Sequence, residues 1–392
     1  MQQYLIIGNG VAGTTAAENI RRNDSAGEIT IVTDEDLPFY YRVRLTDFLG
    51  GGLEETELVA RKKEWYDEKK IRLKLRTKIT QIHSDKRIAL AGDGSSFFYD
   101  RLLLANGSHP FIPPITGSEL DGVHAIHTIA DVRRISKAAE KIKEVVLIGG
   151  GLLGLETANA LHRRGKKITV VEFFPRLLPR QLDPDGAARL QHIFENMGFT
   201  FRLGAITRKI TGGNRARQVI LENGAVLPAD MVIISAGVRP NLALAQSLGL
   251  ETDKGLIVDQ YMRTSGPDIF AAGDIVEFVG KTYGIWPAAM EQGRIAGLNM
   301  SGSQLTAYEG TVLSNILKVA GIDLASAGEI DAENRFTSRI VNSDGVYKKV
   351  VMNHDRVIGC IMLGDRKNFN RINKAISTGE NILETLDTLL NA

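Results

Sequence analysis

Cysteine is almost absent from this chain, since Cys360 is the only one among 392 residues. The chain therefore cannot form an intramolecular disulfide, whether structural or redox-active. No apolar run approaches the ~20 residues that span a membrane, and the N-terminus lacks the basic segment and cleavage site of a signal peptide, so we expect a cytoplasmic protein. The formal net charge is only +2. It gives no basic footprint for nucleic acid, although a mildly basic surface would suit an acidic protein partner.

What the chain does contain is glycine in two informative clusters. GNGVAG occupies residues 8–13 and GGGLLG occupies residues 149–154. Each cluster follows a short apolar run (4–7 or 145–148) and precedes a helical pattern, which predicts strand, turn and helix. In such a loop the first glycine permits the tight turn, the second lets the backbone approach a pyrophosphate, and the third brings the helix close to the strand. The helix N-terminus then offers amide donors and partial positive charge to the phosphates.

The spacing of the apolar runs sets the fold class. Residues 4–34 and 145–172 each read as a βαβ unit, and the repeat at roughly 140 residues indicates two related domains. Pro/Gly-rich crossings at 107–114 and 237–241 follow apolar strands. After residue 302 the pattern changes to alternating strands, such as 347–352 and 357–362, and a final helix. We therefore predict an α/β fold with two Rossmann-like dinucleotide-binding domains plus a small α+β C-terminal domain.

Acidic residues near these loops are candidates to bind sugar hydroxyls. Glu172 stands ~20 residues beyond the second loop, where it would hold the adenosine ribose and repel a 2′-phosphate. It therefore favours NAD over NADP, while Arg176 nearby leaves NADP possible. Asp34 occupies the equivalent place in the first unit, with a solvated turn acid as the alternative. Asp274, after a strand-end glycine, can accept hydrogen bonds from a ribityl chain, with a helix-capping aspartate as the alternative.

A longer series of motifs carries a family resemblance. The series consists of the two glycine loops with Glu156, ANGS at 105–108, G-x-x-P-N at 237–241, and TS and AGD between 264 and 274. In this order it resembles the FAD-dependent pyridine nucleotide–disulfide oxidoreductase superfamily over residues 1–300. The resemblance implies an FAD domain (1–112 and 241–305) interrupted by an NAD(P)H domain (113–240), with a C-terminal domain at 306–392. It also implies that NADH delivers a hydride to FAD.

The motifs and the resemblance together predict a set of cofactor-binding residues and no metal site. The set is Gly8, Gly10, Val11, Ala12, Gly13, Asp34, Glu35, Arg42, Ile79, Ala105, Asn106, Gly107, Gly149, Gly151, Leu152, Leu153, Gly154, Glu156, Glu172, Gly237, Gly273, Asp274 and Trp286. The resemblance implies that Asp274 binds the ribityl chain, that Ile79 lies against the adenine, and that Glu156 sits beside the flavin where the nicotinamide docks.

Departures from the family pattern narrow the chemistry. Disulfide reductases of the family carry a redox cysteine pair after the second strand, and NADH oxidases and peroxidases carry one cysteine there. Residues 39–47 contain none, and Cys360 is expected to be a packed core thiol. The branch of the family that remains consists of rubredoxin, flavorubredoxin and ferredoxin reductases. Within it the chain most resembles NADH:rubredoxin oxidoreductases, which implies a small electron-carrier protein as the partner. A cysteine-free NADH oxidase, a flavin-bearing redox sensor and the flavin subunit of a nitrite-reductase-type complex stay as alternatives.

Asp47 is a further departure, because many relatives have a lysine there, paired with the glutamate that matches Glu156. Two carboxylates without a cation would raise the pKa of one of them and oppose the negative charge of reduced flavin. We hypothesise that Arg44 or Arg42 supplies the missing charge, which makes Glu156, Arg44 and Arg42 the candidate catalytic residues. Arg42, Arg44 and Lys318 are also candidates to face an acidic acceptor, and ordinary phosphate or surface contacts are the alternative.

Overall fold

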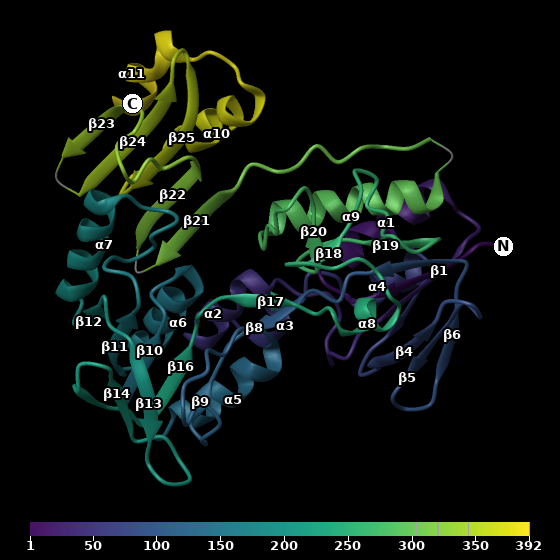
Figure 1. The fold of residues 1–392 in the computed structure, drawn as a ribbon, viewed down its shortest axis with the longest axis horizontal. Coiled ribbons are helices and arrows are strands. Elements are labelled where there is room, and N and C mark those ends of the chain that lie inside the picture. The colour runs from purple at the N-terminus through teal and green to yellow at the C-terminus, as the bar shows by residue number, and fades with distance from the viewer. Residues whose placement is uncertain (303, 320, 344, 392) are drawn as a thin grey trace. The chain divides into compact units, whose positions relative to one another are not determined.

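The computed structural model describes residues 1–302, 304–319, 321–343 and 345–391, and Figure 1 labels the elements. The chain forms two compact units, each assembled from segments that are distant in sequence. The first unit comprises Met1–Tyr41, Glu55–His109 and Val238–Thr311, and the second comprises Arg42–Glu54, Pro110–Gly237 and Val312–Ala392.

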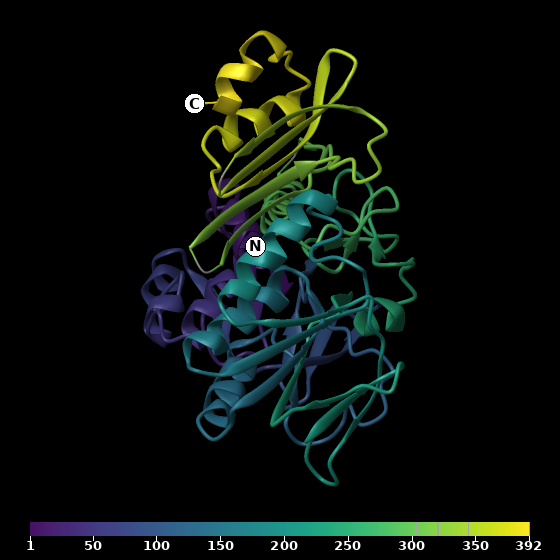
Figure 2. The same cartoon turned by 90° about the vertical axis from the view of Figure 1, so that its left-hand side faces the viewer.

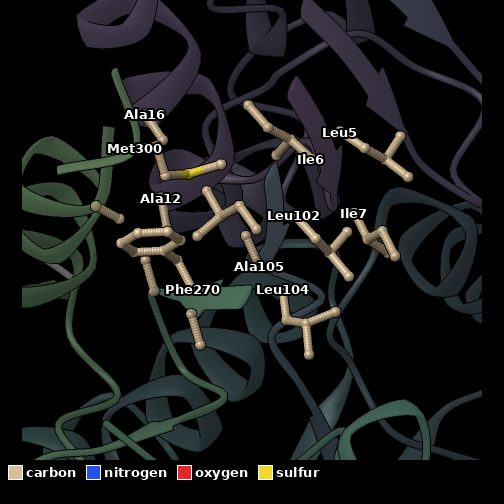
Figure 3. Close-up of a cluster of buried hydrophobic side chains, with 14 of the residues drawn as sticks. Leu5, Ile6, Ile7, Ala12, Ala16, Leu102, Leu104, Ala105, Phe270 and Met300 are labelled. Atoms are coloured by element: carbon tan, nitrogen blue, oxygen red, sulfur yellow. The ribbon is translucent and has the colours of Figure 1, made fainter. Parts of the chain in front are cut away.

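The first unit is built on a five-stranded parallel sheet in the order β19-β7-β1-β2-β3. Its strands are β1 (Gln3–Ile7), β2 (Glu28–Val32), β3 (Ile71–Lys74), β7 (Arg101–Leu104) and β19 (Ile269–Ala271). The central strands read as continuous apolar runs because both faces of a parallel sheet are covered. Figure 3 shows Leu5, Ile6, Leu102 and Leu104 in the resulting core.

Two helices of the first unit pack closely against each other. They are α1 (Val11–Asn23) and α9 (Trp286–Ser301). A Cβ on Gly293 would lie 2.9 Å from the Cα of Ala12, and one on Gly297 would lie 3.0 Å from the Cα of Ala16. Only glycine therefore permits this approach. The other elements of this part of the chain are α3 (Glu55–Leu58), α4 (Lys63–Glu68), β4 (Ile79–His83), β5 (Ile88–Ala91), β6 (Ser96–Phe98), β8 (Ser108–Pro110), β17 (Val238–Pro240), α8 (Ala243–Ser247), β18 (Leu256–Ile257) and β20 (Val276–Glu277).

The second unit contains another five-stranded parallel sheet, in the order β12-β11-β10-β16-β9. The strands are β9 (Val123–His124), β10 (Glu144–Ile148), β11 (Lys167–Glu172), β12 (Thr200–Leu203) and β16 (Met231–Ile234). The accompanying elements are η1 (Arg42–Arg44), α2 (Leu45–Leu49), α5 (Ile129–Ala139), α6 (Leu152–Arg163) and α7 (Pro184–Asn196), with an antiparallel sheet of β13 (Thr207–Thr211), β14 (Gln218–Leu221) and β15 (Val226–Pro228).

The C-terminal part of the second unit is an antiparallel sheet in the order β21-β22-β25-β24-β23. It consists of β21 (Ser314–Val319), β22 (Ile322–Gly328), β23 (Thr337–Ser343), β24 (Val346–Asn353) and β25 (Arg356–Leu363), followed by α10 (Phe369–Thr378) and α11 (Leu383–Asn391). Figure 2 shows both helices on one side of this sheet. Phe369, Ile372 and Leu386 from the helices share a buried cluster with Val350 and Cys360 from the sheet.

A buried polar network joins this sheet to α7. The ammonium of Lys349, which is 0% exposed, lies 3.2 Å from the carboxylate of Asp183, and the hydroxyl of Tyr347 donates to the same carboxylate at 2.6 Å. Asp183 also caps α7 by accepting from the amide of Gly186 at 3.0 Å. The network satisfies the charge that the fold removes from water.

The predicted fold class is confirmed, because each of the two parallel sheets contains a central strand that leads into a glycine loop, and a part with both sheet and helices ends the chain. Cys360 is buried as expected, and burial raises the pKa of its thiol to about 12. Across the described ranges, no helix is both long and apolar enough to cross a membrane. The boundaries of the three predicted domains stay predictions, and the structure groups residues 42–54 with the second unit.

Candidate functional site

The first glycine loop connects β1 to α1. Gly8 has a φ of +113°, and a Cβ there would clash with the carbonyl group of Ala105. Gly13 lies against the carbonyl of Gly8, so a side chain there would separate helix from strand. Gly10, the residue before α1, has no atom within 4 Å of the position a Cβ would take. Gly8 and Gly13 therefore lie tightly against other backbone atoms, whereas Gly10, the second glycine, borders open space. This space fits a pyrophosphate that approaches the backbone.

The second loop, between β10 and α6, repeats this geometry. Gly149 has a φ of +110°, and a Cβ there would clash with the carbonyl oxygen of Ser235. Gly154 again lies against the carbonyl of the first glycine. Gly151 again has nothing within 4 Å of a Cβ position. The two loops therefore offer two equivalent phosphate cradles, one in each unit.

Buried polar atoms beside the first loop also fit a polar ligand. Within the described residues, Asn9 Nδ2 and Asn106 Oδ1 are buried without a hydrogen-bond partner. The amide of Asn106 is oriented by a 2.9 Å bond from its Nδ2 to the carbonyl of Asn241, and Asn241 Nδ2 donates to the carbonyl of Asn106 at 2.6 Å. Because buried polar groups are normally paired, these two atoms are consistent with a partner supplied by a bound cofactor.

The segments that follow β7 and β19 in the first unit contain four further residues of the predicted FAD-binding motifs: Gly107, Ser108, Gly273 and Asp274. Gly107 has a φ of +64° and Gly273 a φ of +89°. The hydroxyl of Ser108 donates to the carboxylate of Asp274 at 3.1 Å across 166 residues of sequence, and the amide of Gly273 donates to Gln292 at 2.9 Å. These contacts hold the Gly273–Asp274 corner in place.

The predicted adenosine acid of the first unit has two neighbouring candidates. Asp34 is exposed just beyond β2. Glu35 is half-buried and accepts a hydrogen bond from the hydroxyl of Tyr40. Ile79, predicted to lie against the adenine, is buried at the start of β4. The choice of Asp34 for the ribose stays a prediction.

Trp286 begins α9 and belongs to an aromatic cluster that the sequence did not reveal. Its ring centroid lies 5.7 Å from that of Phe39 and 5.9 Å from that of Tyr41. Tyr41 is exposed. Val11 and Ala12 form the first turn of α1 in the same unit.

Glu172 ends β11 and turns its carboxylate toward the second loop. Oε2 accepts from the amide of Gly150 at 2.5 Å, and Oε1 accepts from the amide of Phe174 at 2.8 Å. The side chain is 6% exposed. Leu152 and Leu153 are the first residues of α6, and Leu153 is exposed. Gly237 lies between β16 and β17 and has a φ of +97°.

Glu156 lies in the second turn of α6 and faces α2. Thr46 donates from Oγ1 to Glu156 Oε2 at 3.4 Å. Burial, and then the negative charge of Asp47, raise the pKa of Glu156 to about 7, against the lowering effect of the Thr46 bond. The negative charge of Asp47 acts in the predicted direction, although burial is the larger cause.

The two predicted arginines take different positions. Arg44 Nε lies 3.9 Å from Asp47 Oδ2, and the two side chains are 43% and 56% exposed. Arg42 donates from Nη1 to the carbonyl of His127 at 2.8 Å. The structure therefore places Arg44 against Asp47 rather than against Glu156. The side chain of Lys318 lies outside the part of the chain that the structure describes.

Sequence reasoning missed several residues that organise these sites. Tyr66 accepts from the amide of Phe39 at 3.1 Å and donates to Asn9 Oδ1 at 3.0 Å, while Thr14 donates to the same oxygen at 3.3 Å. The glycine pattern gives no signal for Tyr66. Thr46, in contrast, directly precedes Asp47 and could have been found from that position.

These sites define a protein with two dinucleotide-binding folds. The family model described as pyridine nucleotide-disulphide oxidoreductase matches residues 2–293, and the one described as rubredoxin NAD+ reductase C-terminal domain matches residues 314–380. The chain belongs to the pyridine nucleotide-disulphide oxidoreductase family. FAD and a pyridine nucleotide are accordingly its cofactors, and the two phosphate cradles fit two dinucleotides.

Individual relatives point to several activities. The chain is 34% identical to nitrite reductase [NAD(P)H] of Bacillus subtilis over 98% of its own length, but it spans only 48% of that protein. It is 33% identical to the NADH oxidase of Methanocaldococcus jannaschii, over 94% of this chain and 89% of that one. The crystal structure of NADH:rubredoxin oxidoreductase from Clostridium acetobutylicum matches with a TM-score of 0.81 and 26% identity, over 100% of this chain and 99% of that one.

Proposed function

We propose that the chain is a cytoplasmic flavoprotein oxidoreductase that transfers electrons from NADH through FAD to a small electron-carrier protein, most specifically a rubredoxin. The observation that carries this proposal is the pair of phosphate cradles without a cysteine at residues 39–47. Two dinucleotides account for hydride transfer, and the missing thiol removes the disulfide exchange of the reductases that carry a cysteine pair. The electrons would then pass to an acceptor outside these residues, and a one-electron carrier protein is the acceptor we propose.

We assign FAD to the first loop and NADH to the second. FAD, when bound, supplies the two-electron chemistry that accepts a hydride and the one-electron chemistry that serves a carrier protein. Residues 1–112 and 241–305 would form the FAD domain, residues 113–240 the NADH domain, and residues 306–392 the C-terminal domain. The chain itself binds and orients both cofactors, with backbone amides at the start of α1 and α6 directed at phosphates.

Glu172 supports NADH as the donor. Its carboxylate is held by the amides of Gly150 and Phe174, so a fixed negative charge lies beside the loop. A 2′-phosphate would meet this charge, whereas two ribose hydroxyls can donate to it. The NADH in the names of two relatives agrees with this preference.

The C-terminal sheet and helices support rubredoxin as the acceptor. They match a domain model named after rubredoxin NAD+ reductase, and the whole chain matches an NADH:rubredoxin oxidoreductase. Oxygen is a second candidate acceptor, because of the likeness to an NADH oxidase. A third candidate is a role as the flavin part of a larger reductase, since the chain matches about half of a nitrite reductase.

The test is NADH-driven reduction of rubredoxin, ferredoxin, flavorubredoxin, oxygen and peroxide by the purified holoenzyme, ranked by kcat/KM. We expect rubredoxin to rank first by at least an order of magnitude. Reoxidation by air as fast as by rubredoxin would favour the oxidase instead. Slow turnover with every acceptor, together with co-purification of an iron–sulfur protein, would favour the subunit of a larger reductase.

A further inference from the structure

Two carboxylates, Glu156 on α6 and Asp47 on α2, repel each other where these helices meet in the second unit. Glu156 is one helical turn from Leu152, the first residue of α6, and so lies about 6 Å along the helix axis from the second phosphate cradle. Asp47 on α2 repels it, and Thr46 donates to its Oε2 at 3.4 Å. Burial and this like charge bring the pKa of Glu156 to about 7. The charge of Glu156 can therefore change around neutral pH.

The charged groups named below pair with other partners and leave Glu156 without a cation against it. Arg44 lies 3.9 Å from Asp47 on the exposed side of α2, and Arg163 reaches the glycines that follow α2, two turns along α6. Beneath α6, Glu172 is bound by backbone amides. Lys167 and Glu144, at the other end of the strands, pair with each other at 3.1 Å. None of these groups donates to Glu156 in the described part of the chain.

We propose that Glu156 makes the protein distinguish NAD⁺ from NADH in a pH-dependent manner, by releasing its proton when the cationic nicotinamide of NAD⁺ is bound. The proposal rests on the assignment of NADH to the second loop, with its nicotinamide beside Glu156 as the family resemblance implies. The oxidised nicotinamide ring carries a positive charge, and the reduced ring is neutral. A cation close to a carboxyl favours its ionised form, so NAD⁺ binds the ionised Glu156 more tightly, whereas the neutral ring gains nothing from ionisation.

The direction of the effect follows from linkage. Binding of NAD⁺ lowers the pKa of Glu156, and by reciprocity ionisation of Glu156 tightens the binding of NAD⁺. The ratio of the Kd for NAD⁺ to the Kd for the reduced form therefore falls as pH rises through 7. A difference of one pKa unit between the two complexes corresponds to a change of about tenfold in this ratio. Product NAD⁺ is then released more readily on the acid side of neutrality.

The experiment is isothermal titration of the oxidised holoenzyme between pH 6 and 8 with NAD⁺ and with 1,4,5,6-tetrahydro-NAD, a neutral reduced analogue that cannot transfer a hydride. The two ligands share every phosphate and ribose, so other pH effects cancel in the ratio of their Kd values. We expect that ratio to fall about fivefold from pH 6 to pH 8, because the full tenfold change of a one-unit pKa difference extends beyond this range. A constant ratio, with both ligands binding, would overturn the inference and leave the proposed function standing. Failure of both ligands to bind would instead contradict the proposed function.

Two variants connect the effect to the carboxylate pair. Glu156→Gln keeps the shape and the acceptor for Thr46 but cannot ionise, so the ratio should stay at its acid-side value at every pH. Asp47→Asn removes the repulsion while Glu156 remains, so the fall in the ratio should persist with its midpoint at a lower pH. A pH-dependent ratio that survives in Glu156→Gln would assign the effect to another group and overturn the inference.

Discussion

The two glycine loops have nearly the same backbone but are organised by different side chains. Gly8 and Gly149 have φ values of +113° and +110°, and the residues before α1 and α6 share a φ of −79°. In the first loop the middle position is Asn9, whose side chain is bonded to Tyr66 and Thr14. In the second loop the middle position is Gly150, and the carboxylate of Glu172 binds its amide at 2.5 Å.

The comparison distinguishes the backbone features that any pyrophosphate requires from the side chains that suit one particular dinucleotide. The turn, the open cradle and the helix N-terminus are common to both loops because they serve a phosphate. The side chains around the loops differ. The neutral hydroxyl groups of Tyr66 and Thr14 hold Asn9 in the first loop, and the anionic carboxylate of Glu172 holds the amide of Gly150 in the second. An anion beside the cradle can select against a 2′-phosphate, whereas FAD would present no such alternative. On the proposed assignment of FAD to the first loop and NADH to the second, we expect the second loop to select between nucleotides and the first to contribute affinity alone.

The largest expected effect comes from filling each cradle in turn. Gly10→Ala and Gly151→Ala each add a Cβ that meets no protein atom within 4 Å, so the apoprotein should fold normally while the pyrophosphate is excluded. We expect Gly10→Ala to purify without flavin and without activity. Gly151→Ala should retain FAD and lose NADH-driven reduction. Flavin absorbance and single-turnover reduction measure both, and a Gly10→Ala protein that keeps its flavin would remove FAD from the first loop.

Substitution of the two glycines at positive φ should affect the stability of the apoprotein, in contrast to substitution of Gly10 and Gly151. Gly8→Ala and Gly149→Ala force a left-handed backbone and a clash with a carbonyl on a neighbouring strand. Each should destabilise the apoprotein by about 2–4 kcal/mol, measured by urea unfolding. Gly10→Ala and Gly151→Ala are the matched controls and should unfold like the parent. Equal stability in all four variants would show that the loops relax at no cost.

The selectivity of the second loop can be tested at its anion. Glu172→Gln removes the charge and keeps one oxygen, which can accept from one of the two amides, Gly150 or Phe174, that the carboxylate now binds. We expect the ratio of kcat/KM for NADPH to that for NADH to rise about tenfold, equivalent to ~1.4 kcal/mol. Asp34→Asn in the first unit is the control and should leave this ratio unchanged. If the ratio moves in the control and not in Glu172→Gln, the comparison of the two loops is wrong.

The parts predictable from the sequence were those that repeat or have a local period. The loops, the two parallel sheets and the buried Cys360 follow from glycine spacing, apolar runs and alternation. The contacts between distant residues could not be predicted, because no local pattern encodes them. Ser108 reaches Asp274 across 166 residues and Tyr347 reaches Asp183 across 164, and Tyr66 orients Asn9 without any motif of its own. The sequence predicted repulsion between Glu156 and Asp47, but it did not predict that Arg44 would lie against Asp47.

The smallest effect on flavin reduction is expected from substitution of Arg44. This substitution tests whether Arg44 acts as the cation that many relatives provide with a lysine. The guanidinium is 43% exposed and lies 3.9 Å from Asp47, so solvent screens it and its contribution is modest. We expect Arg44→Ala to slow flavin reduction by NADH by about threefold, equivalent to about 0.7 kcal/mol, and to lower the flavin potential slightly, since one positive charge is lost. Stopped-flow reduction and spectroelectrochemistry measure these quantities, and Arg44→Lys should restore both. No change in either would exclude Arg44 as the replacement for the family lysine, whereas a loss of a hundredfold would show that its guanidinium acts on the flavin directly.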